Sequence, residues 1–344
     1  MYGTENLKAK IKMETDKHPV WLGKAILKEK REEKYLGDVF SSLGLSKSVE
    51  ATVSERSGKI KVSIYELRAL IKDFRMQATC GIEAAIDLYG SSIVLSLLAN
   101  CATWLDIEKK TEDKLNKIQD LFGRTLLKAP QSTPWLAIIG SLGLLGMRFR
   151  IFQEKVLLVL AIKEQEENCL AKKVLQEQVR MGWPGLAQEV QKICQQTGLP
   201  DATADNVRID KETVKEAIKL SHLKFMKEEM RGVKLEKMKM TDMRERRSYT
   251  KMRVEEARMA FRLEVFQFDC RANMPAKYGR DLRCRACEPP PGQQQEDQEE
   301  QVEDQEHLEC CSGYAELWDG LGPTTEESRV KYFMRVKTKR LRQQ

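Results

Sequence analysis

The chain has 344 residues, of which 41% are hydrophobic and 32% are charged. This composition is too apolar for a wholly disordered chain, and it excludes collagen, a coiled-coil rod and a disulfide-stabilised miniprotein. The 59 Lys and Arg residues against 52 Asp and Glu residues give a net charge of only +7. The position of that excess along the chain is therefore more informative than its size.

The first ten residues contain Glu5, Lys8 and Lys10 and no apolar run, so they do not form a secretory signal. We expect an intracellular protein, nuclear or cytoplasmic and not secreted, whose nine cysteines are mostly thiols. The longest uncharged stretch is residues 88–105, which includes several Ser, Gly and Asn residues. This stretch predicts a buried protein segment rather than a membrane span, so no membrane partner is expected.

Residues 20–45 read as short extended pieces separated by turns. From about Ile60 onward, apolar residues recur at spacings of three and four, which is typical of helices. The first of these are Ile64, Leu67, Leu70, Ile71 and Phe74. The fold class is therefore mainly α, with short N-terminal strands and a multi-helix bundle.

The helical part divides at residues that start or stop helices. Thr111 is expected to cap a helix that ends at the proline-containing segment 130–134. A longer helix is expected from about Arg150 to Met181, with residues 163–168 facing water. Asp210 is expected to start another helical region.

Residues 208–262 contain 17 Lys and Arg against 10 Asp and Glu, an excess of 17 − 10 = +7 that equals the net charge of the whole chain. Such a segment can follow a phosphate backbone, where each cation releases counterions. We take Arg244, Arg246, Arg247 and Lys251 as the candidate nucleic-acid-binding residues. The alternative is an ordinary solvated helix face, because acidic residues are interspersed throughout the segment.

The strongest local motif is Cys284-x2-Cys287, followed after 19 residues by His307 and the adjacent Cys310 and Cys311. Two cysteines at this spacing, a histidine and a further cysteine form a closed tetrahedral zinc site. The zinc would be structural, since four protein ligands leave no open position for a substrate. Spacing alone leaves Cys310 and Cys311 as alternative fourth ligands. The other interpretations are reduced cysteines in a loose tail and a redox dithiol.

Several catalytic motifs do not occur in the chain. It has no phosphate-binding G-x-x-x-x-G-K-[ST] loop, no H-E-x-x-H, no G-x-S-x-G and no adjacent Asp pair. The histidines His18, His222 and His307 are far apart in sequence, and His222 is expected to be a structural or surface residue. No catalytic residue is therefore assigned.

A collinear series of short motifs runs through nearly the whole chain. Its N-terminal members are Lys34-Tyr35-Leu36-Gly37 on a strand, Leu88-Tyr89-Gly90-Ser91-Ser92-Ile93 with Trp104, Leu115 with Gln119, Leu121, Phe122 and Arg124, and Pro134 with Leu142-Gly143-Leu144-Leu145 and Arg148-Phe149-Arg150-Ile151. Its C-terminal members are Arg262, Phe268-Asp269, Asn273, Cys284-x2-Cys287 and Gln305-Glu306-His307-Leu308. In order and spacing, the series resembles the thumb and C-terminal region of the reverse transcriptases of non-LTR (LINE-type) retrotransposons.

The resemblance implies a thumb-like helical bundle that binds RNA and DNA, as template-primer or element RNA, and no small-molecule substrate. It also implies a zinc-knuckle-like C-terminal tail, and it favours Cys311 over Cys310 as the fourth ligand. The palm aspartates that hold magnesium in such polymerases do not occur in this chain. We therefore expect a fragment that binds nucleic acid and does not polymerise DNA, from a decayed copy or a partial gene.

On this interpretation the chain has four parts. They are a palm-end remnant with short strands at 1–58, a thumb-like region at 59–150, a basic helical region at 151–265, and a Cys/His tail at 266–344 with an acidic loop at 288–306. The alternative function is a helical protein-interaction or scaffold protein with a zinc-stabilised adaptor tail.

Overall fold

The computed structural model describes residues 21–22, 25–26, 32–35, 37–73, 81–231, 251–265, 305–321 and 325–343. Within these residues the fold is mainly helical, as predicted, and the strands form two separate two-stranded antiparallel sheets.

The strands lie in the N-terminal segment where short extended pieces were expected. They are β1 (Trp21–Leu22), β2 (Ala25–Ile26), β3 (Glu32–Tyr35) and β4 (Asp38–Ser41). Strand β3 pairs with β4 through a tight turn in which Gly37 has a φ of 87°, a conformation that favours glycine.

Helix α2 (Leu45–Asp73) begins well before Ile60, where the sequence first showed a helical period. Its buried residues Val49, Val53, Ile60, Ile64 and Leu67 follow one stripe, but Ser, Glu and Lys residues separate the first two from the others. That half of the helix is held by tertiary contacts, such as the bond from the Val39 backbone N–H to Thr52 Oγ1 at 2.8 Å. The boundary expected between residues 58 and 59 lies inside this helix.

The uncharged stretch 88–105, together with the helix that leads into it, forms four short helical pieces, and most of the apolar side chains of the stretch are buried in the protein. The pieces are α3 (Gly81–Leu88), the π-helix η1 (Tyr89–Val94), α4 (Leu95–Leu97) and the 3-10 helix η2 (Cys101–Thr103). The ring of Tyr89 stacks on Phe122, with centroids 3.9 Å apart. Across the described residues, no helix has the length and apolar character needed to cross a membrane.

Two expectations in the middle of the chain were wrong. Thr111 does not cap its helix, because α5 (Lys109–Leu127) begins two residues earlier and Glu108 occupies the N-cap. The single helix expected from Arg150 to Met181 is two helices, α7 (Met147–Lys163) and α8 (Leu170–Met181).

Lys163, the last residue of α7, does not face water as expected, because its side chain is bound to a distant segment. Its ammonium group turns inward and donates to the backbone carbonyls of Ala202 and Val207, at 3.0 Å each, and to that of Ala204. Burial lowers the pKa of Lys163. The next five residues are polar and exposed, as expected, so no apolar face continues the helix.

The remaining helices complete the bundle. They are α6 (Trp135–Ser141), α9 (Leu186–Thr197), α10 (Lys211–Glu229), α11 (Val254–Glu264), α12 (Gln305–Cys310), the 3-10 helix η7 (Ser312–Trp318) and α13 (Glu326–Gln343). The start of α10 was predicted correctly: Asp210 accepts from the backbone N–H groups of Glu212 at 3.0 Å and Thr213 at 2.9 Å.

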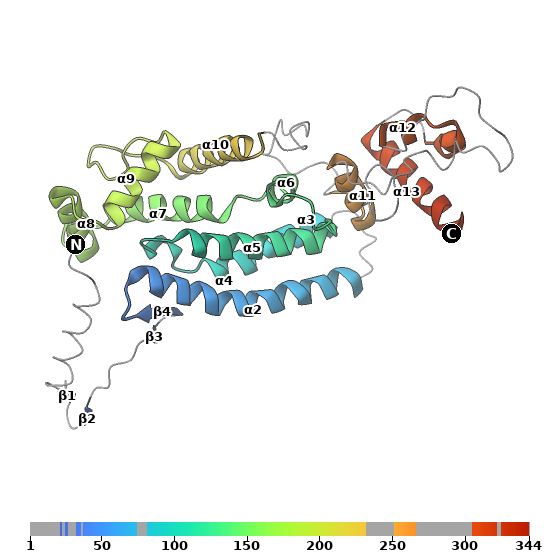
Figure 1. Cartoon of the computed structure of the whole chain (residues 1–344). Coiled ribbons are helices and arrows are strands. Elements are labelled where there is room, and N and C mark those ends of the chain that lie inside the picture. Colours follow the sequence, from blue (N-terminus) through green and yellow to red (C-terminus); the bar gives the residue numbers. More distant parts are fainter. Residues whose placement is uncertain are drawn as a thin grey trace.

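Helices α2, α5, α7 and α10 lie in successive layers, with α8 and α9 at one end and α11 to α13 at the other (Figure 1). Two hydrophobic clusters form the core. One contains residues from helices α2 through α6 and from α11 through α13. The other contains residues from helices α7 through α10. Helix α7 contributes to both, since Ile151 belongs to the first cluster and Val156 and Val159 to the second.

Candidate functional site

The four expected zinc ligands are only partly placed. Cys284 and Cys287 lie outside the described residues, and His307 lies on α12. Cys310 is exposed, whereas Cys311, at the N-cap of η7, is 3% exposed. Within the described ranges, no group of three or more potential metal ligands occurs. The zinc site, and the choice between Cys310 and Cys311, therefore stay predictions.

The segment around Cys311 is firmly packed. Tyr332 on α13 donates its hydroxyl to the Leu308 carbonyl, and its ring stacks on Trp318 with centroids 4.2 Å apart. The indole N–H of Trp318 donates to the Glu309 carbonyl at 3.1 Å. These contacts hold α12, η7 and α13 together, so the His307–Cys311 motif is anchored on a folded support.

The expected nucleic-acid-binding residues lie mostly in a segment without described structure. Arg244, Arg246 and Arg247 are outside the described residues, and Lys251 is exposed just before α11. The structure adds a neighbouring set that the sequence analysis did not single out. It comprises Lys224, Lys227 and Arg231, which we call the α10 basic row.

Lys224 and Lys227 lie about one turn apart near the end of α10, and Arg231 follows two residues after the helix ends at Glu229. All three are exposed, and none makes an ion pair with a described carboxylate. The chain then runs directly into residues 232–250, which carry the arginines of the sequence prediction. The described cations and the predicted ones therefore belong to the same stretch of net positive charge, residues 208–262.

Two residues of the motif series hold segments of the bundle together. Gln119 on α5 donates to the Leu145 carbonyl at 3.0 Å. Arg124 donates to the carbonyls of Pro130 at 2.6 Å and Thr133 at 2.7 Å. Both contacts fix the connection between α5 and α7, so these two residues have structural roles here.

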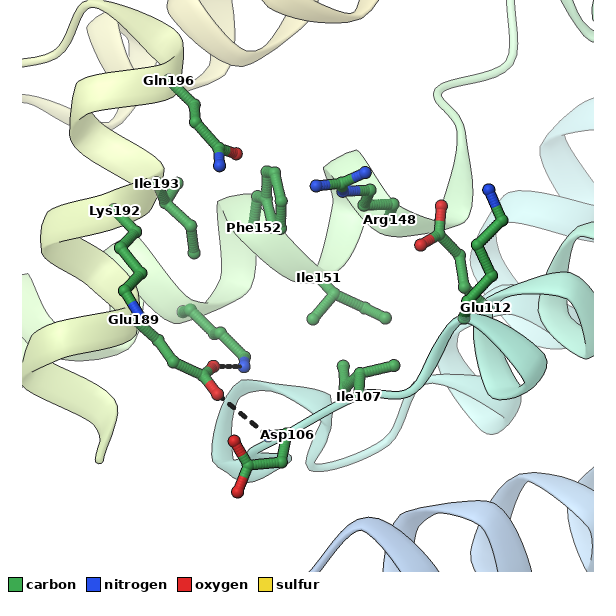
Figure 2. A pocket seen from close by; sticks show the side chains of 12 residues that line it. Asp106, Ile107, Glu112, Arg148, Ile151, Phe152, Glu189, Lys192, Ile193 and Gln196 are labelled. Atoms are coloured by element: carbon green, nitrogen blue, oxygen red, sulfur yellow. Dashed lines mark hydrogen bonds and ion pairs between the residues drawn. The ribbon is translucent and has the colours of Figure 1, made fainter. Parts of the chain in front are cut away.

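A cavity of about 430 Å³ lies between α7, α9 and the segment that leads into α5 (Figure 2). Its apolar wall comes from both core clusters: Ile107 and Ile151 pack in the first, and Phe152 and Ile193 in the second. The cavity therefore lies where the two parts of the core meet. Its volume is within the range of small-ligand sites in proteins.

A buried ion pair closes one side of this cavity. Lys155 on α7 is 3% exposed, and its ammonium group donates to Glu189 on α9. The other oxygen of Glu189 accepts from the Asp106 backbone N–H at 2.9 Å. Asp106 has a φ of 53°, so the hydrogen bond holds a left-handed turn. Three separate segments thus meet at one carboxylate.

Cationic and aromatic groups lie around the rest of the cavity. The guanidinium of Arg148 lies 5.1 Å from the centroid of the Phe152 ring. Lys192 and Gln196 are one helical turn apart on α9, and in Figure 2 Phe152 lies between Gln196 and Arg148. Lys109 and Glu112 complete the lining at the start of α5. The cavity therefore combines an apolar wall, an aromatic ring and several charges.

The sequence analysis missed this cavity. Asp106, Lys155 and Glu189 are separated by tens of residues, and each lies in an unremarkable local pattern. The only local signal is that Phe152 and Lys155 border an apolar run of α7. Nothing in the sequence links that helix to Glu189.

His222 is a structural residue, as one of the two expectations had it. It is buried on α10, its Nε2 accepts from the Gly146 backbone N–H at 3.3 Å, and its ring lies 4.8 Å from that of Phe149. Burial lowers the pKa of His222 to about 4. The neutral ring is the form that can accept this bond.

No protein-family model, no curated protein and no solved structure matches the chain significantly.

Proposed function

We propose that the chain is a nucleic-acid-binding fragment similar to the thumb and C-terminal region of a non-LTR retrotransposon reverse transcriptase, and that it does not polymerise DNA. The observation that carries the proposal is the α10 basic row, with its continuation into Arg244, Arg246 and Arg247. Cations that are exposed and free of carboxylate partners can each neutralise a phosphate and release a counterion. Recognition of this kind follows backbone charge and shape rather than base sequence.

Two further features support this function. The motif series from Lys34 to His307 is collinear with the family's order. The helical fold is compatible with a thumb-like bundle. On this proposal, structural zinc bound by Cys284, Cys287, His307 and Cys311 stabilises the C-terminal tail. The tail then adds to the nucleic-acid-binding surface.

Charge-removal variants test the proposal. Replacing Lys224, Lys227 and Arg231 with Ala removes up to three phosphate contacts and should reduce the slope of log K against log salt by about 2 for a single strand. Replacing Arg244, Arg246, Arg247 and Lys251 together should reduce it by about 3. Filter binding to several unrelated RNA and DNA sequences gives both slopes.

A matched control removes the same charge elsewhere. Lys61 and Arg68 on α2 and Lys173 on α8 are exposed and make no described ion pair. In Figure 1, α2 lies on the opposite side of the layers from α10, and α8 lies at one end of the bundle. Their triple alanine variant should keep the parental slope. Equal slopes for the parent and the α10 variant would show that the basic row is an ordinary solvated face.

The second candidate function is a helical scaffold protein, and one observation favours it. Leu170, Val174 and Met181 lie on one face of α8 and are 75%, 48% and 47% exposed. An exposed apolar row is typical of a protein-binding helix. Protein association through this row should persist at high salt, whereas nucleic-acid binding should not. Leu170→Asp should abolish the association and leave nucleic-acid binding unchanged.

A further inference from the structure

We propose that the loop between α9 and α10 is a binding site for a cation of the size of ammonium, and that the side chain of Lys163 occupies this site as a tethered cation. The loop consists of residues 201–207, which we call the cation loop. When the Lys163 side chain is removed, the vacated loop should bind a free ammonium ion. This site lies outside the proposed function, because none of its residues belongs to the α10 basic row.

Three backbone carbonyls of the cation loop converge on one point. The Lys163 ammonium group donates to the carbonyls of Ala202 and Val207, at 3.0 Å each, and to that of Ala204. A lysine has three N–H donors, so the loop satisfies all of them. Converging backbone carbonyls are the groups with which proteins replace the water around a bound cation. The loop therefore has acceptors for three of the four N–H groups of a free ammonium ion, and water in the space of the removed side chain can accept the fourth.

The cation loop also has its own support. The Asp201 carboxylate accepts from the Thr203 backbone N–H at 2.9 Å and from the Thr203 hydroxyl at 2.7 Å. Gln191 on α9 donates to the same hydroxyl oxygen at 3.0 Å, and the Ala204 backbone N–H donates to the Asp201 carbonyl at 3.2 Å. None of these bonds involves Lys163. We therefore expect the loop to keep its shape without that side chain, which makes it preorganised for a free ion.

Acidic groups of the same loop favour a positive charge at this point. Burial lowers the pKa of Lys163, and the carboxylates of Asp205 and Asp201 oppose this effect. Their negative charges would act in the same way on any other cation bound there. Both residues are exposed parts of the loop itself, so their charge stays when Lys163 is replaced. The loop therefore favours a cation over a neutral ligand.

The distances in the loop select the kind of cation. Oxygen atoms 3.0 Å from the Lys163 nitrogen fit N–H···O hydrogen bonds. Calcium needs oxygen ligands at about 2.3–2.6 Å and magnesium at about 2.0–2.1 Å, and sites for either ion usually include carboxylates among the ligands. Among the described residues, no three carboxylate, histidine or cysteine side chains are grouped to hold a metal ion. The geometry therefore fits a monovalent cation with N–H donors.

The test compares urea denaturation of the full chain in ammonium chloride and in sodium chloride at equal ionic strength. In sodium chloride, Lys163→Ala should unfold at a lower urea concentration than the parent, because three carbonyls lose their donor. Ammonium should raise the urea midpoint of this variant and not that of the parent. At an ammonium concentration ten times the fitted Kd, the folded-to-unfolded ratio of the variant should be about elevenfold higher than without ammonium. Tetramethylammonium, which has no N–H donor, should not reproduce the effect.

Three further variants serve as controls. Lys163→Met keeps a side chain of similar length without N–H donors, so it fills the space and should not respond to ammonium. Lys173→Ala removes an exposed lysine on α8, outside the cation loop, and should behave as the parent in both salts. Adding Asp205→Asn to Lys163→Ala removes one negative charge of the loop, so this double variant should need more ammonium for the same rise in midpoint.

A second measurement uses the parent and holds even where Lys163→Ala does not fold. In a ¹H–¹⁵N spectrum of the parent with labelled lysine, the Lys163 ammonium group should give a signal protected from exchange with water, and Lys163→Met should lack it. An equal effect of ammonium and sodium on folded Lys163→Ala would overturn the inference. If that variant folds in neither salt, the absence of a protected signal in the parent would overturn it. Neither result changes the salt dependence of nucleic-acid binding, so the proposed function is tested separately.

Discussion

Lys155 on α7 and Glu189 on α9 form an ion pair that joins the two helices beside the cavity, with the lysine 3% exposed and the glutamate 25% exposed. Glu189 also accepts from the Asp106 backbone, so its carboxylate links three segments. Because one partner is almost fully buried, removing the other leaves a charge in a poorly solvated position.

Glu189→Gln should therefore destabilise the protein by about 2–3 kcal/mol, somewhat below the range for fully buried pairs because Glu189 is partly solvated. The double variant Lys155→Met/Glu189→Met should be within about 1 kcal/mol of the parent, since it leaves no unpaired charge. Urea denaturation measures both. Glu112→Gln is the control, because this carboxylate lines the same cavity and forms no ion pair with a described residue, and it should lie within about 0.5 kcal/mol of the parent. A Glu189→Gln variant as stable as that control would contradict the account.

His222 should make stability fall with acid. Its pKa is about 4 in the folded protein against 6.5 as the ordinary value, so the unfolded chain binds more protons between these values. Its contribution is complete above pH 6.5 and is lost as the pH falls toward 4, about 2.5 kcal/mol between pH 7.5 and 4.5.

The variant His222→Gln keeps an acceptor near the Gly146 N–H but does not titrate. Between pH 7.5 and 4.5 the parent should lose about 2.5 kcal/mol more stability than this variant. Subtracting the free energy of unfolding of the variant from that of the parent removes the contribution of carboxylates that titrate equally in both proteins. If the free energies of unfolding of the parent and of His222→Gln change in parallel with pH, His222 is not the group responsible.

A structural feature could be predicted from the sequence when the residues that produce it are close together in the chain. The cap at Asp210 uses backbone groups two and three residues away, so it was predicted correctly. The inward position of the Lys163 side chain depends on carbonyls at residues 202–207, and the cavity depends on contacts between residues 106, 155 and 189. No window of sequence contains those partners. The early start of α2 was missed for the same reason, because β4 and α5 support it.

The zinc prediction concerns stoichiometry. Purified protein should carry about one equivalent of zinc, and Cys284→Ser should lose it. Cys310→Ser is the matched control and should retain zinc, whereas Cys311→Ser should not. Since Cys311 is buried, circular dichroism of each variant must show whether the helical fold is retained. Metal-free protein at neutral pH, or dependence on Cys310 alone, would refute this ligand set.

Polymerase activity is expected to be at background. Phosphoryl transfer by this class of polymerase needs carboxylates that hold two divalent ions, and the chain has no adjacent aspartate pair. Primer extension on an RNA template with Mg²⁺ or Mn²⁺ is the assay. Template-dependent extension by the purified chain would show that other residues hold the metals.

The central claim is that this chain binds nucleic acid through phosphate contacts. The most direct measurement is filter binding of the unmodified chain to a single-stranded RNA between 50 and 200 mM salt. Three contacts from the α10 basic row alone give a slope near −2, which weakens binding by a factor of about ten or more over this range. Deleting residues 293–304, whose carboxylates repel the same backbone, should leave affinity equal or higher. An affinity that does not change with salt, or the absence of binding at 50 mM, would contradict the claim.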